Sequence, residues 1–205
     1  MKKTLLIVAL AVTMLFTVAV GCKQTGEPTN NRPTSSRHPA SIKIQGVEYS
    51  TSYTAIHLVG AGLTNEDIVP LQYMTNLNEL ILSKNEISDI SPLAGLTSLV
   101  NLNLNNNQII DISPLADLTN LETLYLFNNQ IVDISALADL TNLQELNLTD
   151  NQVSDISALS GFHPIGEIHL SGNPVSDWSP IKHVIDVTGR PFSERNSNQH
   201  LTVDS

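Results

Sequence analysis

Residues 77–98 read LNELILSKNEISDISPLAGLTS, and the chain repeats this pattern three more times without a gap. The further copies are LVNLNLNNNQIIDISPLADLTN (99–120), LETLYLFNNQIVDISALADLTN (121–142) and LQELNLTDNQVSDISALSGFHP (143–164). Every 22-residue copy keeps its large apolar residues, which are leucine or isoleucine except for Val153 and Phe162, and one asparagine, one aspartate and one serine in the same places. Because polar as well as apolar positions stay in register, the stretch indicates one structural unit written four times.

The apolar positions predict a short strand and a turn in each unit. In the third unit Leu124 and Leu126 lie two residues apart, so both side chains point to one side of a strand. One residue before them and four after them complete an apolar set that a single unit cannot bury: Leu121, Ile131, Ile134, Leu137 and Leu140. Stacking successive units makes a continuous core.

The polar positions predict how the chain leaves each strand. An asparagine recurs at the ninth position, where we expect its side chain to bond backbone groups of the turn: Asn85, Asn107, Asn129, Asn151 and Asn173. Ser91-Pro92 predicts a serine N-cap and a proline at the first position of a single 3₁₀ turn. The aspartate two residues before this serine is expected to form an Asx turn, and a column of calcium sites is the alternative.

A period of roughly 20–29 residues with the pattern L-x-x-L-x-L-x-x-N-x-L is that of the leucine-rich repeat. The 22-residue unit resembles the short repeats of bacterial internalin-like surface proteins, and the resemblance covers about residues 42–191. It implies an α/β solenoid: a right-handed superhelix with a parallel β-sheet on the concave face and 3₁₀ turns on the convex face. It also implies that partners bind along the concave face.

The repeat extends beyond the four units in both directions. We expect a first coil over residues 53–76, with the extra pair Asn65-Glu66 forming a loop. We expect a last coil over residues 165–183. Between them lie the four coils 77–98, 99–120, 121–142 and 143–164.

A solenoid must cover the core at both ends. Apolar residues around Gly46 predict an N-terminal cap, a strand or short hairpin, over residues 42–52. At the other end Trp178 stands where other coils have isoleucine, and we expect its larger ring to cover the core together with a closing segment, residues 184–191. Residues 192–205 are polar and predict a flexible tail.

The first 21 residues predict a lipoprotein signal peptide. Two lysines precede an apolar run, Leu5 to Val20, that is short for a membrane span and suits a secretory signal. The small residues before Cys22, the chain's only cysteine, resemble a bacterial lipobox, which implies cleavage before Cys22 and diacylation of its sulfur. The alternatives are an ordinary signal peptide and an uncleaved anchor. Residues 22–41 would then carry the lipid and form a disordered linker, because they lack an apolar pattern.

Composition narrows the partner class. The 205 residues are 41% hydrophobic, enough for one solenoid domain, and carry a formal charge of −10. This acidity disfavours nucleic acid and anionic lipid as electrostatic partners, and favours solubility or a basic partner surface. A single cysteine leaves no intramolecular disulfide. We expect a monomer with no nucleic-acid partner and no cofactor.

Alternation along each strand predicts which side chains line the concave face. The middle row is His57, Ile81, Asn103, Tyr125, Asn147 and His169. Tyr125 and Phe127 lie in one central unit, at places where the other units carry smaller or polar side chains. We expect these exposed rings to anchor a protein partner, together with Ile81, Asn103, Asn147 and His169. The alternative is that two exposed aromatic side chains have no function.

No motif in the sequence indicates catalysis. The chain has no G-x-S-x-G, Walker loop or H-E-x-x-H, so we predict that it is not an enzyme. Glu145, Glu167 and His169 lie in neighbouring coils and could hold a divalent ion. Stacked carboxylates on a solvated face are the commoner explanation, so we predict no metal.

These observations predict a membrane-tethered binding module outside the cytoplasm, in the bacterial cell envelope. Its N-terminal lipid would hold it on the membrane while the concave face binds a protein. Adhesion to a host or neighbouring cell is suggested only by analogy with the internalins. The alternative is a structural envelope lipoprotein that binds wall polymer or another surface protein.

Overall fold

The structure is a computed structural model that describes residues 38–162, 167–184 and 187–191. The predicted signal peptide, Cys22, most of the predicted linker and the predicted tail lie outside the described residues. Within the described residues, no helix has the length and apolar character needed to cross a membrane.

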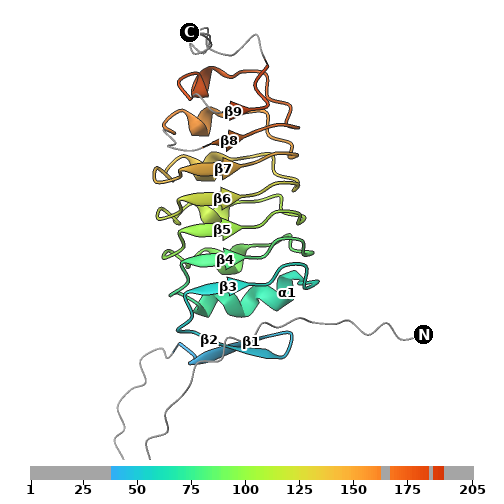
Figure 1. Cartoon of the computed structure of the whole chain (residues 1–205), viewed down its shortest axis with the longest axis vertical. Coiled ribbons are helices and arrows are strands. Elements are labelled where there is room, and N and C mark those ends of the chain that lie inside the picture. Colours follow the sequence, from blue (N-terminus) through green and yellow to red (C-terminus); the bar gives the residue numbers. More distant parts are fainter. Residues whose placement is uncertain (1–37, 163–166, 185–186, 192–205) are drawn as a thin grey trace, which may run out of the picture. The chain divides into compact units, whose positions relative to one another are not determined.

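The described residues from 53 to 191 form a stack of coils, each contributing one strand to a parallel sheet of seven strands in the order β3-β4-β5-β6-β7-β8-β9 (Figure 1). The strands are β3 Ala55–His57, β4 Glu79–Ile81, β5 Asn101–Asn103, β6 Thr123–Tyr125, β7 Glu145–Asn147, β8 Ile168–His169 and β9 Val187–Thr188. On the opposite side lie short 3₁₀ helices: η1 Val69–Tyr73, η2 Ser91–Leu93, η3 Ser113–Leu115, η4 Ser135–Leu137, η5 Ser157–Leu159 and η6 Ser179–Ile181. The leucine-rich-repeat solenoid predicted from the sequence is confirmed.

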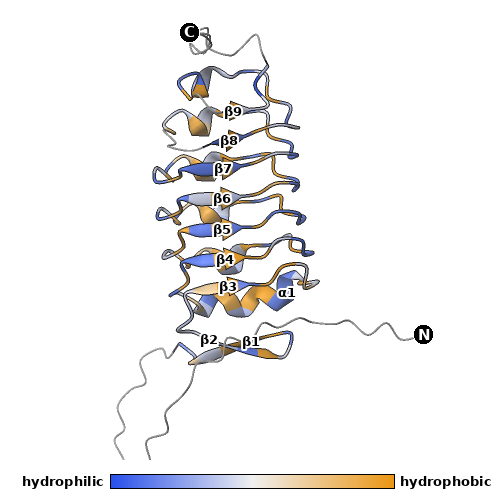
Figure 2. Cartoon of the chain, in the orientation of Figure 1, coloured by the Kyte–Doolittle hydropathy of each residue, from blue (hydrophilic) through white to orange (hydrophobic). Residues whose placement is uncertain are grey.

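The core runs the length of the stack, as the spacing of the leucines predicts. Leu124 and Leu126 are completely buried. In earlier coils Leu80 is also completely buried, and Leu102 is almost completely buried. Figure 2 shows the resulting change between hydrophobic and hydrophilic segments along each coil. Because a single coil cannot bury its leucines without the coils on either side, the sheet keeps one fixed register.

The asparagines that recur at the ninth position of each coil do more than close their own turns. The Asn129 side chain accepts a hydrogen bond from the Ile109 N–H (3.0 Å) and donates to the carbonyls of Leu104 (3.1 Å) and Leu126 (3.0 Å). Leu126 belongs to the same coil, whereas Ile109 and Leu104 belong to the preceding one. The predicted backbone bonding is confirmed, and it also ties each coil to its predecessor.

The turn that follows each asparagine corrects one prediction. Ser91 is not the N-cap: Ile90 occupies that position, and the Ser91 side chain makes no capping bond. Instead the Asp89 carboxylate accepts from the Ser91 N–H at 2.8 Å, so the expected Asx turn is confirmed and satisfies the first N–H of the 3₁₀ helix. Asp111, Asp133, Asp155 and Asp177 repeat this bond.

The first coil differs from the others. The extra pair of residues does not form a loop but begins a helical turn, α1 Asn65–Ile68, which runs into η1. Thr64 is its N-cap, and the Thr64 N–H donates to the Asp67 carboxylate at 2.8 Å. This reciprocal capping makes a helix more favourable than a loop.

Both ends of the core are covered. A hairpin of β1 Ser41–Ile44 and β2 Val47–Ser50 packs on η1 and buries Ile42 and Ile44. Strand β1 therefore begins inside the predicted linker. At the other end Trp178 is buried as expected, with the Arg190 guanidinium 6.0 Å from its ring centre. The closing segment adds the seventh strand, β9, which the sequence did not predict.

Candidate binding surface on the sheet face

The outward side chains of β3 to β8 form a surface that we call the sheet face. Strand register places the predicted middle row in one line, since His57 pairs with Ile81, and the pairing continues through β5, β6 and β7 to His169 on β8. Parallel strands lie about 4.8 Å apart, so successive members of the row are neighbours. The structure therefore brings together the predicted residues Ile81, Asn103, Tyr125, Asn147 and His169.

The two central aromatic side chains are less exposed than the sequence suggested. Tyr125 and Phe127 are both half-buried, because alternation fixes the direction of a side chain but not how closely its neighbours pack around it. Burial and a hydrogen bond to the Glu145 carboxylate raise the pKa of Tyr125 to about 12. The phenol therefore stays protonated near neutral pH and donates to Glu145.

A hollow of about 270 Å³ lies over the centre of the sheet face. It sits above β5, where short asparagine side chains stand between the larger Ile81 and Tyr125, and it is lined by Glu79, Ile81, Asn101, Leu102, Asn103, Thr123 and Tyr125. The Asn103 side-chain oxygen accepts from the Asn105 N–H (3.1 Å), which leaves the Asn103 amide NH₂ as a donor. The hollow thus combines apolar walls with amide groups on its floor.

Histidine–carboxylate pairs occupy both ends of the sheet face. His57 Nε2 bonds the Glu79 carboxylate, and His169 Nε2 lies 3.0 Å from the Glu167 carboxylate. Since an ionised carboxylate only accepts, the histidine Nε2 atoms are the donors. The second His169 nitrogen lies 3.1 Å from the Thr188 hydroxyl, which fixes the ring from its other side.

The predicted trio of possible metal ligands does not converge. His169 pairs with Glu167, whereas Glu145 bonds Tyr125. Among the described residues, no three histidine, cysteine or acidic side chains form a group that could hold a metal ion. The repeat alignment does not predict the pairing of Glu145 with Tyr125, because these residues are diagonal neighbours on adjacent strands and belong to different rows.

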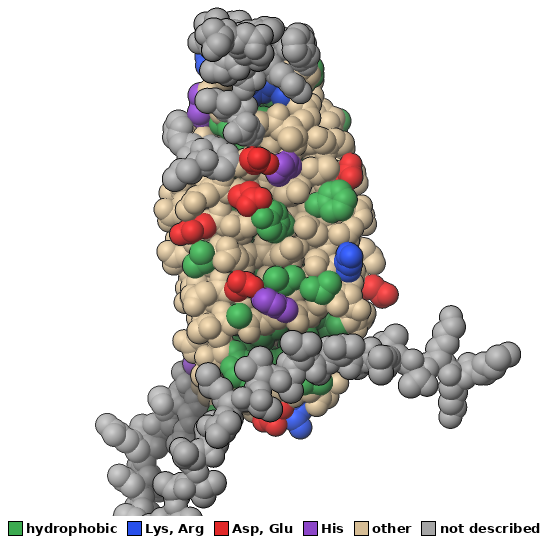
Figure 3. Space-filling view, in the orientation of Figure 1, with side chains coloured by type: hydrophobic (Ala, Val, Ile, Leu, Met, Phe, Trp, Pro, Cys, Tyr) green, Lys and Arg blue, Asp and Glu red, His purple; other side chains and the backbone are tan. Residues whose placement is uncertain are grey.

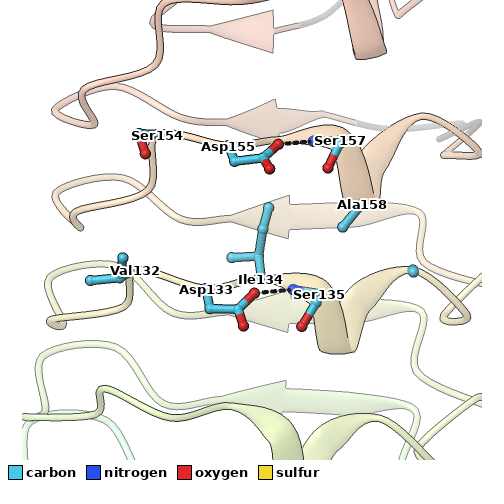
Figure 4. A pocket seen from close by; sticks show the side chains of 9 residues that line it. Val132, Asp133, Ile134, Ser135, Ser154, Asp155, Ser157 and Ala158 are labelled. Atoms are coloured by element: carbon cyan, nitrogen blue, oxygen red, sulfur yellow. Dashed lines mark hydrogen bonds between the residues drawn. The ribbon is translucent and has the colours of Figure 1, made fainter.

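A second hollow, of about 460 Å³, lies on the opposite side of the solenoid between η4 and η5 (Figure 4). Ala158, one of its lining residues, stands where Pro92 and Pro114 stand in earlier coils. Asp133 and Asp155 border it, and each is already bonded to a backbone N–H of its own turn, as Figure 4 shows. These carboxylates are therefore part of the repeat architecture.

The sequence matches the family described as Leucine Rich repeats (2 copies) over residues 75–117, 119–161 and 141–183. Among solved structures, an internalin (inlF) from Listeria monocytogenes is 36% identical with a TM-score of 0.61, covering 69% of this chain and 43% of that one. The L. monocytogenes internalin C2 (inlC2) is 31% identical with a TM-score of 0.47, covering 68% of this chain and 82% of that one.

A leucine-rich-repeat protein from Leptospira interrogans is 25% identical with a TM-score of 0.51, covering 58% of this chain and 32% of that one. The chain thus spans less than half the length of the first internalin and about a third of the Leptospira protein. No curated protein sequence matches the chain significantly.

Proposed function

Because the chain belongs to the leucine-rich-repeat family and its repeats are internalin-like, we propose that it binds a protein partner through the sheet face. The observation that carries this proposal is the central hollow, with the half-buried Tyr125 and Ile81 as its walls. The repeat does not require an aromatic or aliphatic side chain at these positions, since the equivalent residues in the flanking strands include Asn103 and Asn147. Side chains of this kind at the centre of a surface commonly dominate the free energy of binding.

The proposed contact residues have different roles. Tyr125, Phe127 and Ile81 would bury apolar area against the partner. Asn103 and Asn147, on either side of Tyr125, would supply amide donors and acceptors to the partner. His169, held by Glu167 and Thr188, would mark the C-terminal border of the contact.

We also propose that the module is tethered outside the cytoplasm by acyl chains on Cys22. Support comes from the sequence alone, through the short apolar run and the small residues before the cysteine. Two or more acyl chains would hold the protein stably on a membrane. Adhesion would be one use of such a module, and binding of wall polymer is the alternative use of the same tethered solenoid.

Photocrosslinking of the full chain tests the proposal. A benzophenone amino acid at Asn147, beside the hollow, should capture a surface protein of the cells that express the chain. The same group at Asp117, an exposed residue just after η3, serves as the matched control and should not. Capture at Asn147 should disappear when Tyr125 and Phe127 are both changed to alanine.

Two results would contradict the proposal. Equal capture from both positions, or capture that survives the double alanine substitution, would place the partner elsewhere. Retention of the full chain on purified wall glycan, lost with the same double substitution and without any captured protein, would favour the wall-polymer alternative.

A further inference from the structure

The charge of the solenoid points to a cationic partner. From residue 85 to residue 181 the chain has no lysine or arginine, yet it has twelve acidic residues: Glu86, Asp89, Asp111, Asp117, Glu122, Asp133, Asp139, Glu145, Asp150, Asp155, Glu167 and Asp177. Figure 3 shows acidic and histidine side chains on the same face as the hydrophobic ones, with few basic side chains among them. A surface with one sign of charge attracts segments of the opposite sign and speeds their association.

Two of the carboxylates on the sheet face are held in place by donors on the preceding strand. His57 on β3 bonds Glu79 on β4, and Tyr125 on β6 bonds Glu145 on β7. A carboxylate has two oxygens, so a donor on one of them leaves the other able to accept from a cation. Groups that are already oriented lose less conformational entropy when a partner binds.

These two carboxylates flank the hollow. Glu79 lies at its border, and Glu145 lies one strand beyond Tyr125. Strands β4 and β7 are three spacings apart, about 14 Å at the usual 4.8 Å per strand. An extended peptide rises about 3.3 Å per residue and points every second side chain to the same face, so residues i and i+4 span about 13 Å. Residue i+2 then points into the hollow.

We propose that the sheet face recognises an extended segment with two lysine or arginine side chains four residues apart and an apolar side chain midway between them. The basic side chains reach Glu79 and Glu145, and the apolar one enters the hollow between Ile81 and Tyr125. The Asn103 amide NH₂ faces the peptide as a donor for a backbone carbonyl. This inference rests on the proposed function, since it names the chemistry of the partner for the same surface.

The test uses the full chain and fluorescein-labelled peptides with blocked ends, measured by fluorescence polarisation. The probe GSKSLSKSG carries the proposed pattern. Three matched peptides remove one feature each: GSESLSESG reverses the charge, GSKSSSKSG lacks the apolar side chain, and GSSKLKSSG brings the lysines two residues apart. We expect each matched peptide to bind at least about tenfold more weakly than the probe, and the probe to bind more weakly as salt is raised.

Protein variants locate the contact. Glu79→Gln and Glu145→Gln should each weaken binding of the probe about fivefold to tenfold, since each removes one charged acceptor. Asp139→Asn makes the same change in net charge at an exposed residue just after η4 and should change affinity less than about twofold.

Three outcomes would overturn the inference. They are equal binding of the acidic peptide, an Asp139→Asn effect as large as that of Glu145→Gln, and no binding of the probe. None of these bears on the crosslinking result from Asn147, so a captured partner without the basic pattern would leave the proposed function standing while this inference fails.

Discussion

Changing Asn129 to alanine would test whether the asparagine ladder holds the coils together. The side chain makes one bond as acceptor, from the Ile109 N–H, and three as donor, to the carbonyls of Leu104, Leu126 and, at 3.5 Å, Phe127. Each carbonyl keeps another partner, because Leu104 also accepts from the Asn107 side chain, Leu126 from the Asn151 side chain and Phe127 from the Asn106 N–H. Only the Ile109 N–H is therefore left without its partner.

An unpaired buried N–H costs about 1–3 kcal/mol, and the lost packing of the side chain adds to it. We therefore expect Asn129→Ala to lower the free energy of unfolding by about 2–3 kcal/mol. The neighbouring Gln130 is exposed, so Gln130→Ala should cost no more than about 0.5 kcal/mol. Asn173 makes the same bonds in the last coil but is only partly buried. Water can therefore replace the lost hydrogen bonds, and Asn173→Ala should lower the free energy of unfolding less than Asn129→Ala does.

Urea unfolding of the full chain, extrapolated linearly to water, measures these differences. A loss at Asn129→Ala no larger than that at Gln130→Ala would show that the ladder contributes nothing measurable to the free energy of unfolding. An equal loss at Asn129 and Asn173 would refute the part that depends on burial.

Three further predictions concern the core, the anchor and the phenol. Leu126→Ala, in the middle of the stack, should lower the free energy of unfolding by on the order of 2–5 kcal/mol. Ile56→Ala should lower it less, because the hairpin can relax over the end coil. Equal losses in urea unfolding would show that the position of the coil does not matter. Cys22→Ser should abolish acylation, which radiolabelled palmitate would detect, and label on the variant would disprove the anchor. The phenol of Tyr125 should ionise at about pH 12 in a difference titration of phenolate absorbance against Tyr125→Phe. Because this pKa is raised on folding, its contribution to stability is complete below about pH 10, the unfolded value, and is lost as the pH rises through about 12. Glu145→Gln should lower the pKa while burial keeps it above the ordinary value, and an unchanged pKa would exclude the bond.

The sequence predicted the sheet and its rows because one residue spacing governs them. Once Leu124 and Leu126 point inward, their neighbours must point outward, and the repeat length aligns them with the same positions in other coils. The hairpin could be predicted from Gly46, because glycine readily adopts the positive φ that such a turn requires, and Gly46 has a φ of +82°. The helix α1 could also have been found, since Thr64 and Asp67 have the spacing of a capping box.

Contacts between coils were harder to predict. Tyr125 reaches Glu145, and His57 reaches Glu79, across a diagonal between adjacent strands rather than along a row. Such contacts depend on side-chain length and rotamer, which a repeat alignment does not contain. The half-burial of Phe127 has the same origin, because it depends on the side chains beside it rather than on the direction of its own.

The most direct test of the sheet face is the affinity of a crosslinked partner for the full chain with both Tyr125 and Phe127 changed to alanine. Truncating an interface anchor commonly costs about 2–4 kcal/mol of binding free energy. Since about 1.4 kcal/mol of binding free energy corresponds to a factor of ten in affinity, the variant should bind at least about thirtyfold more weakly. Calorimetry at a temperature well below the melting temperature measures this difference. An unchanged affinity in this variant, with binding instead lost on Val132→Ser on the far side of the coil, would contradict the sheet face as the binding surface.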